Sequence, residues 1–156
     1  MKIADLLSPE LIKLPLERNE KQEVIAELVD LLAANQKVKD PDSAFKAILE
    51  REKVMSTGVG DHVAIPHGKS DGVDEVVGAF GISDTDINFE SIDNKPVRLV
   101  FLLIATPNAT GSHLKVLSRV SRLLNKNEFR NSLLQAKTSQ QVLDLIRREE
   151  EAVFET

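Results

Sequence analysis

The sequence predicts one domain of the α/β class, in which a mixed β-sheet has helices on both faces. Residues 97–105 form a nearly continuous apolar run between Pro96 and Pro107, which is typical of a strand buried on both faces. Helix-spaced apolar residues occur before and after this run, so helices can cover each face of the sheet. The length of 156 residues, of which 42% are hydrophobic, fits one domain with a full core.

The first 52 residues are expected to supply an edge strand and two helices. Residues 11–14 alternate imperfectly and suit an edge strand. Residues 21–34 have helical spacing, with Asn19 as a candidate N-cap. A second helix begins at Asp40-Pro41, a capping residue followed by proline at the first helical position, and ends near Arg51-Glu52. The predicted core positions of the two helices are Val24, Ile25, Leu28, Leu31, Leu32, Phe45, Ile48 and Leu49.

Residues 56–69 are expected to form a glycine-rich turn, a short strand and a histidine. The β-branched residues within 63–65 favour an extended backbone. Pro66 cannot continue a central hydrogen-bond ladder, so it ends the strand and leaves His67 at the strand end. Gly68 lets the chain leave at dihedral angles that other residues avoid. Because α/β sheets place functional groups at strand ends, His67 is the principal site candidate, with an ordinary turn histidine as the alternative.

The second half of the chain is expected to contain two long strands and a helix that carries a histidine. The strands are residues 75–82 and 97–105, and the polar residues 83–96 between them resemble a loop, with residues 87–89 as a candidate short edge segment. Ser112 can cap a helix whose first turn contains His113, near the positive end of the helix dipole. The predicted inward face of this helix comprises Leu114, Leu117, Val120 and Leu124.

The C-terminal region is expected to contain two shorter helices and an acidic tail. The helices begin at about Asn127 and at Thr138, and the spacing from Thr138 to Gln141 fits a capping box. Beyond Arg148 the chain is acidic and expected to fray, so the domain is predicted over residues 1–148 and the tail over residues 149–156. The acidic residues of this tail are interpreted as solvated.

Composition excludes several classes of function. Without cysteine there is no disulfide, thiolate nucleophile or thiolate metal site. A net charge of −5 argues against nucleic-acid binding. No P-loop pattern occurs, and Gly58 and Gly60 alone are too weak for a dinucleotide site, so no cofactor is predicted. No long apolar run or signal peptide is present, so a cytoplasmic protein without membrane insertion is expected.

The pair of His67 and His113 points to phosphoryl chemistry. A neutral imidazole attacks phosphorus well, and the phosphoramidate that forms can still pass the group on. Arg51 and the hydroxyls of Ser56 and Thr57 can stabilise the phosphoryl oxygens. The alternatives are structural: Arg51 as a cation at a helix end, the two hydroxyls as turn formers, and His113 as a solvated first-turn residue.

Two other function classes stay open. A zinc site would use the histidines, but His62 and His67 are five residues apart across a strand and would point to opposite faces. A regulatory binding module without phosphorylation would be supported if both ring nitrogens of His67 were bonded inside the protein.

The motif around His67 resembles a known family. The residues that carry the resemblance are Arg51-Glu52, Ser56-Thr57-Gly58, Gly60, Val63-Ala64-Ile65-Pro66-His67-Gly68-Lys69, His113-Leu114, Leu117-Ser118 and Leu123-Leu124. They are similar to enzyme IIA proteins of the fructose and mannitol class of the bacterial phosphoenolpyruvate-dependent sugar phosphotransferase system, and most like the free-standing, nitrogen-regulatory type. The resemblance covers about residues 3 to 148.

The resemblance implies a phosphotransferase with a mixed sheet and helices on both faces. It implies that the phosphorylated histidine phosphocarrier protein transfers its group to Nε2 of His67. Arg51 would hold the phosphoryl oxygens, and His113 would be the second active-site histidine. The group would then pass to an enzyme IIB of a sugar permease, or it would act as a regulatory switch. The lack of a IIB or permease portion slightly favours the switch.

Overall fold

The apolar run of residues 97–105 forms β6 (Val97–Ala105), the centre of the sheet in a computed structural model that describes residues 2–154. All its residues except Arg98 are buried, as the sequence predicted for a strand covered on both faces. The strand order is β1-β5-β6-β3-β2, and β4 also pairs with β6. The other strands are β1 (Ile12–Lys13), β2 (Gly58–Gly60), β3 (Val63–Ala64), β4 (His67–Lys69) and β5 (Val77–Ile87).

Parallel and antiparallel pairs are combined in this sheet. β5 runs antiparallel to β6, whereas β3 and β4 both run parallel to it and β1 runs parallel to β5. Because β1 stands at the end of the strand order, it is an edge strand, as predicted for residues 11–14. The structure thus confirms a mixed sheet.

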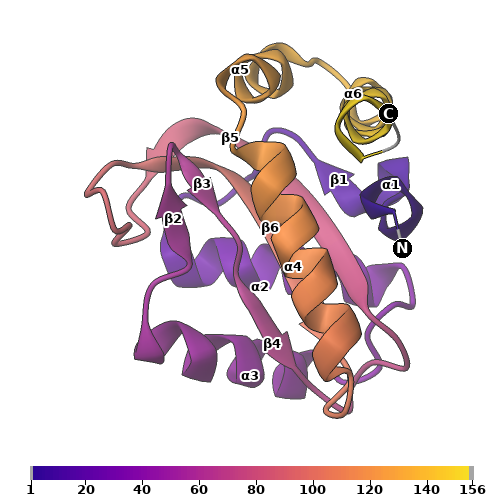
Figure 1. Ribbon diagram of the computed structural model, residues 1–156. Coiled ribbons are helices and arrows are strands. Elements are labelled where there is room, and N and C mark those ends of the chain that lie inside the picture. The colour runs from indigo at the N-terminus through magenta and orange to yellow at the C-terminus, as the bar shows by residue number, and fades with distance from the viewer. Residues whose placement is uncertain (1, 155–156) are drawn as a thin grey trace.

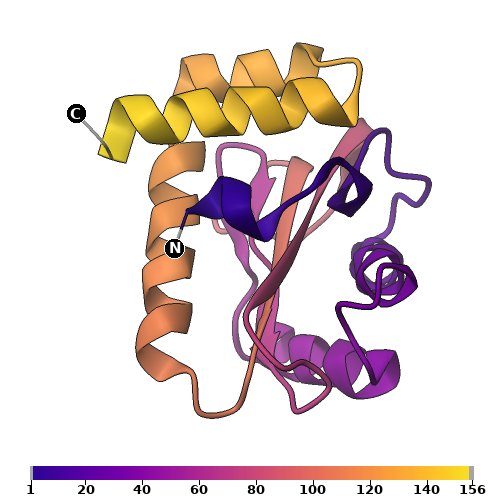
Figure 2. The same cartoon turned by 90° about the vertical axis from the view of Figure 1, so that its right-hand side faces the viewer.

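Helices cover both faces of the sheet (Figures 1 and 2). One layer contains α2 (Lys21–Ala34) and α3 (Pro41–Val54), and the opposite layer contains α4 (Thr110–Leu124). Across one end lie α5 (Asn127–Gln135) and α6 (Ser139–Phe154), with α1 (Ile3–Leu6) packed on α6 and the short 3-10 helix η1 (Pro9–Leu11) leading into β1. Within residues 2–154, no helix combines the length and apolar character needed to cross a bilayer.

Two predicted helix caps form and two do not. Asp40 accepts a hydrogen bond from the Ser43 N–H at 3.1 Å, and Gln141 N–H donates to Thr138 Oγ1 at 3.1 Å. The α2 helix is preceded by Glu20 rather than by Asn19 as its N-cap residue. The α4 helix begins at Thr110, so Ser112 lies inside its first turn and is not its cap.

The structure also corrects one predicted strand boundary and one predicted helix face. β5 extends through residues 83–87, predicted as a loop, because Ile87 pairs with Val97 beyond a shift in register. Leu114, predicted to face the core, is 60% exposed. Val120 and Leu124 are buried as predicted, and the inward face of α4 also contains His113, Val116 and Leu123.

The predicted acidic tail is wrong for residues 149–154, which continue α6 to Phe154. Glu150 is only 1% exposed. Its carboxylate accepts hydrogen bonds from the backbone N–H groups of Ile3 and Ala4, both at 2.7 Å, and pairs with Arg119 at 2.9 Å. The carboxylate thus caps the first helix and balances a cation of α4, which explains its burial. Residues 155–156 of the predicted tail lie outside the described residues.

We expect Glu150→Gln to lower the free energy of unfolding by about 3 kcal/mol, because it removes a buried charge whose partners stay in place. Urea denaturation measures this change. The control is Glu151→Gln, an exposed acid on the same helix, which should change stability by less than about 0.5 kcal/mol. Equal small effects of both substitutions would contradict a structural role for Glu150.

Candidate functional site

A two-residue turn joins β2 to β3 and sets up the site. Asp61 and His62 both have positive φ angles, of 56° and 69°, as a hairpin turn that follows the twist of its strands requires. Gly60 precedes them with a φ of 101°, which glycine adopts without strain. His62 is exposed, and its Nδ1 lies 2.8 Å from the Pro96 carbonyl.

Ile65 and Pro66 separate β3 from β4. Pro66 interrupts the ladder as predicted, but its carbonyl accepts from Leu103 N–H at 3.0 Å, and His67 opens the next strand rather than ending the sheet segment. A Cβ atom at Gly68 would lie 3.1 Å from the backbone nitrogen of Ile48. The absence of a side chain there lets α3 pack directly on β4.

The His67 imidazole is held by the segment that precedes its strand. Its Nδ1 lies 2.8 Å from the Ile65 carbonyl oxygen, which can only accept, so Nδ1 carries the hydrogen. In the neutral ring the lone pair is then on Nε2. Burial lowers the pKa of His67, and the charge of Arg51 lowers it further, against the Ile65 hydrogen bond and the charge of Glu52. Half-buried His67 is therefore neutral at pH 7, with its Nε2 lone pair available for chemistry.

His113 faces His67 from the first turns of α4. The two ring centroids are 5.5 Å apart, with ring planes inclined at 54°. His113 is only 5% exposed, which contradicts the interpretation of a solvated residue. Within residues 2–154 its Nδ1 finds no hydrogen-bond partner. Burial, followed by the charges of His67 and Lys69, lowers the pKa of His113 to about 4.

We expect the protein to lose stability as the pH falls from 6.5 towards 4, because His113 takes up a proton in the unfolded chain before it does so in the fold. The contribution of this group is on the order of 2 kcal/mol. Urea denaturation across this range, with His113→Gln as the comparison, isolates it. Parallel stability curves for the two proteins would refute the lowered pKa.

Arg51 lies in the last turn of α3, where its charge acts on His67 as predicted. Its Nη1 donates a hydrogen bond to the Met55 carbonyl at 2.8 Å. This bond directs the Arg51 side chain along the segment that follows α3 and leads into the β2–β3 hairpin. The guanidinium remains partly exposed. The fold thus brings Arg51, His67 and His113 together from three separate elements.

The hydroxyls of Ser56 and Thr57 are already used inside the protein. Ser56 Oγ donates to the Phe89 carbonyl at 2.6 Å and accepts from Gly58 N–H at 3.0 Å. The Thr57 hydroxyl donates to Glu52 and is buried. Both residues therefore shape the turn. Phosphate binding by their hydroxyls stays a prediction and would require these bonds to break.

Glu52 is a site residue to which the sequence assigned no role. Its side chain is buried and accepts hydrogen bonds from the backbone N–H and the hydroxyl of Thr57, the first at 2.9 Å. Lys21 of α2 reaches the same carboxylate at 2.8 Å. These contacts fix the end of α3, and with it Arg51, against the hairpin that leads to His67. The position of Glu52 beside Arg51 in the motif was the feature of the sequence that could have indicated its role in the site. No feature of the sequence indicated that Lys21 would pair with it.

We expect Glu52→Gln to lower the free energy of unfolding by about 2 kcal/mol, because it leaves the Lys21 ammonium with only the exposed Glu90, at 4.0 Å, as a charge partner. Adding Lys21→Met should cost less than the sum of the single effects, with a coupling of about 1 kcal/mol measured by a double-mutant cycle. Glu50→Gln, at an exposed position of the same helix, is the control. Strict additivity would show that the two charges do not interact.

The site residues do not resemble a metal centre. Within residues 2–154, no group of three His, Asp or Glu side chains is arranged to hold a metal ion. His62 makes its contact with Pro96 and not with the other two histidines.

Comparison with known proteins assigns the family. The family model described as "Phosphoenolpyruvate-dependent sugar phosphotransferase system, EIIA 2" matches residues 5–149. The chain belongs to this EIIA 2 family. It is 42% identical over 146 residues to the fructose-specific EIIABC component of Bacillus subtilis, covering 94% of this chain and 23% of that protein. It is 38% identical over 146 residues to the nitrogen regulatory protein of Bradyrhizobium diazoefficiens, covering 94% and 95% of the two chains.

Solved structures agree with the EIIA 2 assignment. The nitrogen regulatory protein IIA-Ntr from Neisseria meningitidis superposes with a TM-score of 0.86 and 34% identity, covering 92% of this chain and 98% of the other. Enzyme IIA mannitol from Escherichia coli, solved in complex with phosphorylated enzyme IIB mannitol, has a TM-score of 0.78 and 25% identity, covering 91% and 97%. This EIIA 2 chain thus spans about a quarter of the fructose-specific relative and nearly all of the regulatory ones.

Proposed function

We propose that the protein is a phosphoryl carrier that accepts phosphate on Nε2 of His67. The observation that carries this proposal is the bond from Nδ1 of His67 to the Ile65 carbonyl, since it leaves the Nε2 lone pair for attack. The donor is the phosphorylated histidine phosphocarrier protein. Membership of the EIIA 2 family supports this assignment.

In the transfer, the Nε2 lone pair forms a bond to phosphorus while the phosphorus–nitrogen bond of the donor breaks. The donor imidazole leaves with that electron pair, so no further reactant is needed. Nδ1 of His67 keeps its proton throughout and donates it in the hydrogen bond to the Ile65 carbonyl. This bond holds the imidazole ring in a fixed orientation. Arg51 balances the phosphoryl charge, and His113, 5.5 Å away between ring centroids, donates to a phosphoryl oxygen from its buried position.

The phosphoryl group on His67 has two alternative uses in this proposal. One is an enzyme IIB, because an EIIA neighbour of this chain is solved with a phosphorylated enzyme IIB. The other is a regulatory switch, in which the two states of His67 bind different targets, because this chain matches nitrogen regulatory proteins over nearly their whole length. We place the phosphotransfer domain over residues 1–148 together with the remainder of α6, and the protein in the cytoplasm.

The test is intact mass after incubation with phosphoenolpyruvate, enzyme I and the histidine phosphocarrier protein. We expect a gain of one phosphoryl group, lost on brief acid treatment, because a phosphoramidate hydrolyses in acid. Long-range proton–nitrogen NMR of the product should place the group on Nε2. Adding an enzyme IIB of the fructose or mannitol class then shows whether the group leaves, which separates the relay from the switch.

Substitutions locate the acceptor within the same experiment. His67→Ala should abolish labelling, whereas the control His62→Ala, which removes an exposed histidine from the neighbouring hairpin, should be labelled like the original protein. His113→Ala and Arg51→Gln should fold and accept phosphate about a hundredfold more slowly, because each removes one stabilising group from the transition state. Labelling that survives His67→Ala would move the acceptor elsewhere and refute the mechanism.

A further inference from the structure

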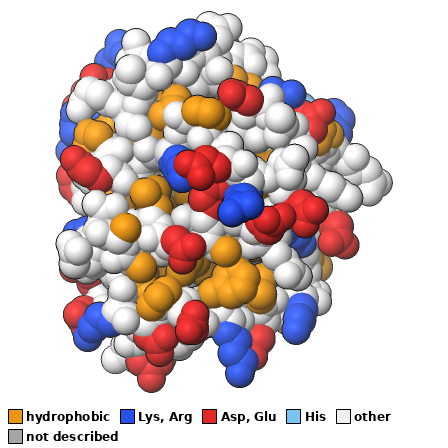
Figure 3. All heavy atoms as spheres, turned by 180° about the vertical axis from the view of Figure 1, so that it is seen from behind, with side chains coloured by type: hydrophobic (Ala, Val, Ile, Leu, Met, Phe, Trp, Pro, Cys, Tyr) orange, Lys and Arg blue, Asp and Glu red, His pale blue; other side chains and the backbone are white. Residues whose placement is uncertain are grey.

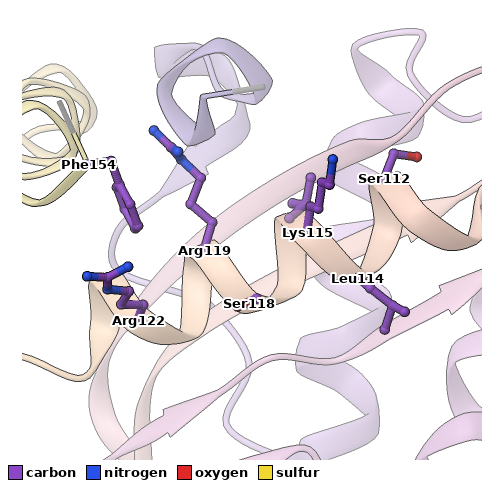
Figure 4. Close-up of a pocket in the computed structure, with 8 residues that line it drawn as sticks. Ser112, Leu114, Lys115, Ser118, Arg119, Arg122 and Phe154 are labelled. Atoms are coloured by element: carbon purple, nitrogen blue, oxygen red, sulfur yellow. The ribbon is translucent and has the colours of Figure 1, made fainter.

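A hollow of about 500 Å³ lies along the outer side of α4 and is separate from the ring of His67. We call it the α4 groove. Ser112, Lys115 and Arg119 extend from the same side of the helix, and Phe154 approaches from the end of α6 (Figure 4). Arg122 and the exposed Leu114 also line it.

The α4 groove is positively charged in a protein whose net charge is −5. Its lining contains three cations and no acidic residue. Residues 94–127, which include all of α4, contain no Asp or Glu. On the opposite side of the molecule, which carries α2 and α3, acidic and basic side chains are interspersed (Figure 3). The positive charge of α4 is therefore concentrated locally.

Two cations of the groove have charge available for a partner. Within residues 2–154, Lys115 and Arg122 form no ion pair, and both side chains are exposed. Arg119 differs, because its Nε is bonded to the buried Glu150.

An aromatic ring positions the arginines. The Arg119 and Arg122 guanidinium groups lie over the ring of Phe154, at 4.0 and 5.2 Å from its centroid. Cation–π contacts of this kind restrict the arginine side chains before any partner arrives. The entropic cost of ordering them on binding is reduced accordingly.

We propose that the α4 groove docks an acidic, amphipathic segment of a partner protein. From Ser112 to Arg122 the helix rises about 15 Å, which matches two to three turns of a docked helix. The row of cations is complementary to carboxylates, and Leu114 and Phe154 supply apolar contacts. The exposed Leu114 in the lining favours an amphipathic peptide over a nucleic acid, whose phosphates are contacted by charged and hydrogen-bonding groups.

The groove adjoins the candidate site without using its residues. It begins at Ser112, the chain neighbour of His113, and runs towards the C-terminal end of α4. A docked segment would therefore lie beside the phosphoryl site while leaving His67 and Arg51 uncovered. The proposal does not depend on phosphorylation of His67.

Fluorescence anisotropy tests the proposal with a labelled synthetic peptide about three helical turns long, with glutamates along one face and leucines along the other. We expect saturable binding that weakens as salt is raised, and none of the peptide in which lysine replaces each glutamate. The double variant Lys115→Glu with Arg122→Glu should weaken binding at least about tenfold.

The matched control is Lys37→Glu with Lys46→Glu, which makes the same change in net charge at exposed positions outside the groove. It should weaken binding less than about threefold, because only screened long-range attraction is lost. Circular dichroism verifies that both double variants fold, and the single variants Lys115→Gln and Arg122→Gln provide the same test if charge reversal disturbs α4. Phosphorylation of the groove variant on His67 should match that of the original protein, which keeps this test separate from the proposed function.

Three outcomes would overturn the proposal. The first is equal loss of affinity in the groove variant and the control, which would show attraction by net charge alone. The second is the absence of binding to the glutamate peptide. The third is tighter binding of a single-stranded oligonucleotide of the same charge, which would make a nucleic acid the occupant.

Discussion

The site depends on the direct contact between the backbones of α3 and β4 at Gly68. Because no side chain separates them there, the last turn of α3 lies beside the strand that presents His67. Arg51 and Glu52 are thereby brought to the imidazole from a helix that ends more than ten residues earlier in the chain. A larger residue at this position would separate the helix from the strand and move the Arg51 cation away from His67.

The charges of the site are set by the burial of its two histidines and by the pairing of Glu52 with Lys21. Burial lowers the pKa of both His67 and His113, so both rings are neutral at pH 7 and the Nε2 lone pair of His67 is available. The one buried carboxylate close by, on Glu52, is paired with Lys21 and bonded to Thr57. Its negative charge is therefore balanced within the protein, and Arg51 stays partly exposed for an incoming anion.

The sequence was sufficient for features that depend on local pattern. The apolar run of β6, the caps of α3 and α6, and the meeting of His67, His113 and Arg51 were all predicted from spacing, turn residues or family motif. The pairing of Glu52 with Lys21 and the burial of Glu150 were not, because an acidic residue on a helix shows the same pattern whether its partner is water or a distant donor. The burial of His113 was not predicted either, because the sequence placed Leu114 on the inward face of α4, whereas Val116 and Leu123 lie there beside the histidine.

The bonds from Ile3 and Ala4 to Glu150 join residues that are 147 and 146 positions apart. A helix of only four residues has no stability of its own in water, so α1 cannot persist before its acceptor is in place. During synthesis, Glu150 is added 146 residues after Ala4, so the acceptor is absent while residues 3–149 are being made. The α1 helix therefore docks late although it precedes the whole sheet in the sequence, and this part of the fold closes only after α6 has been made.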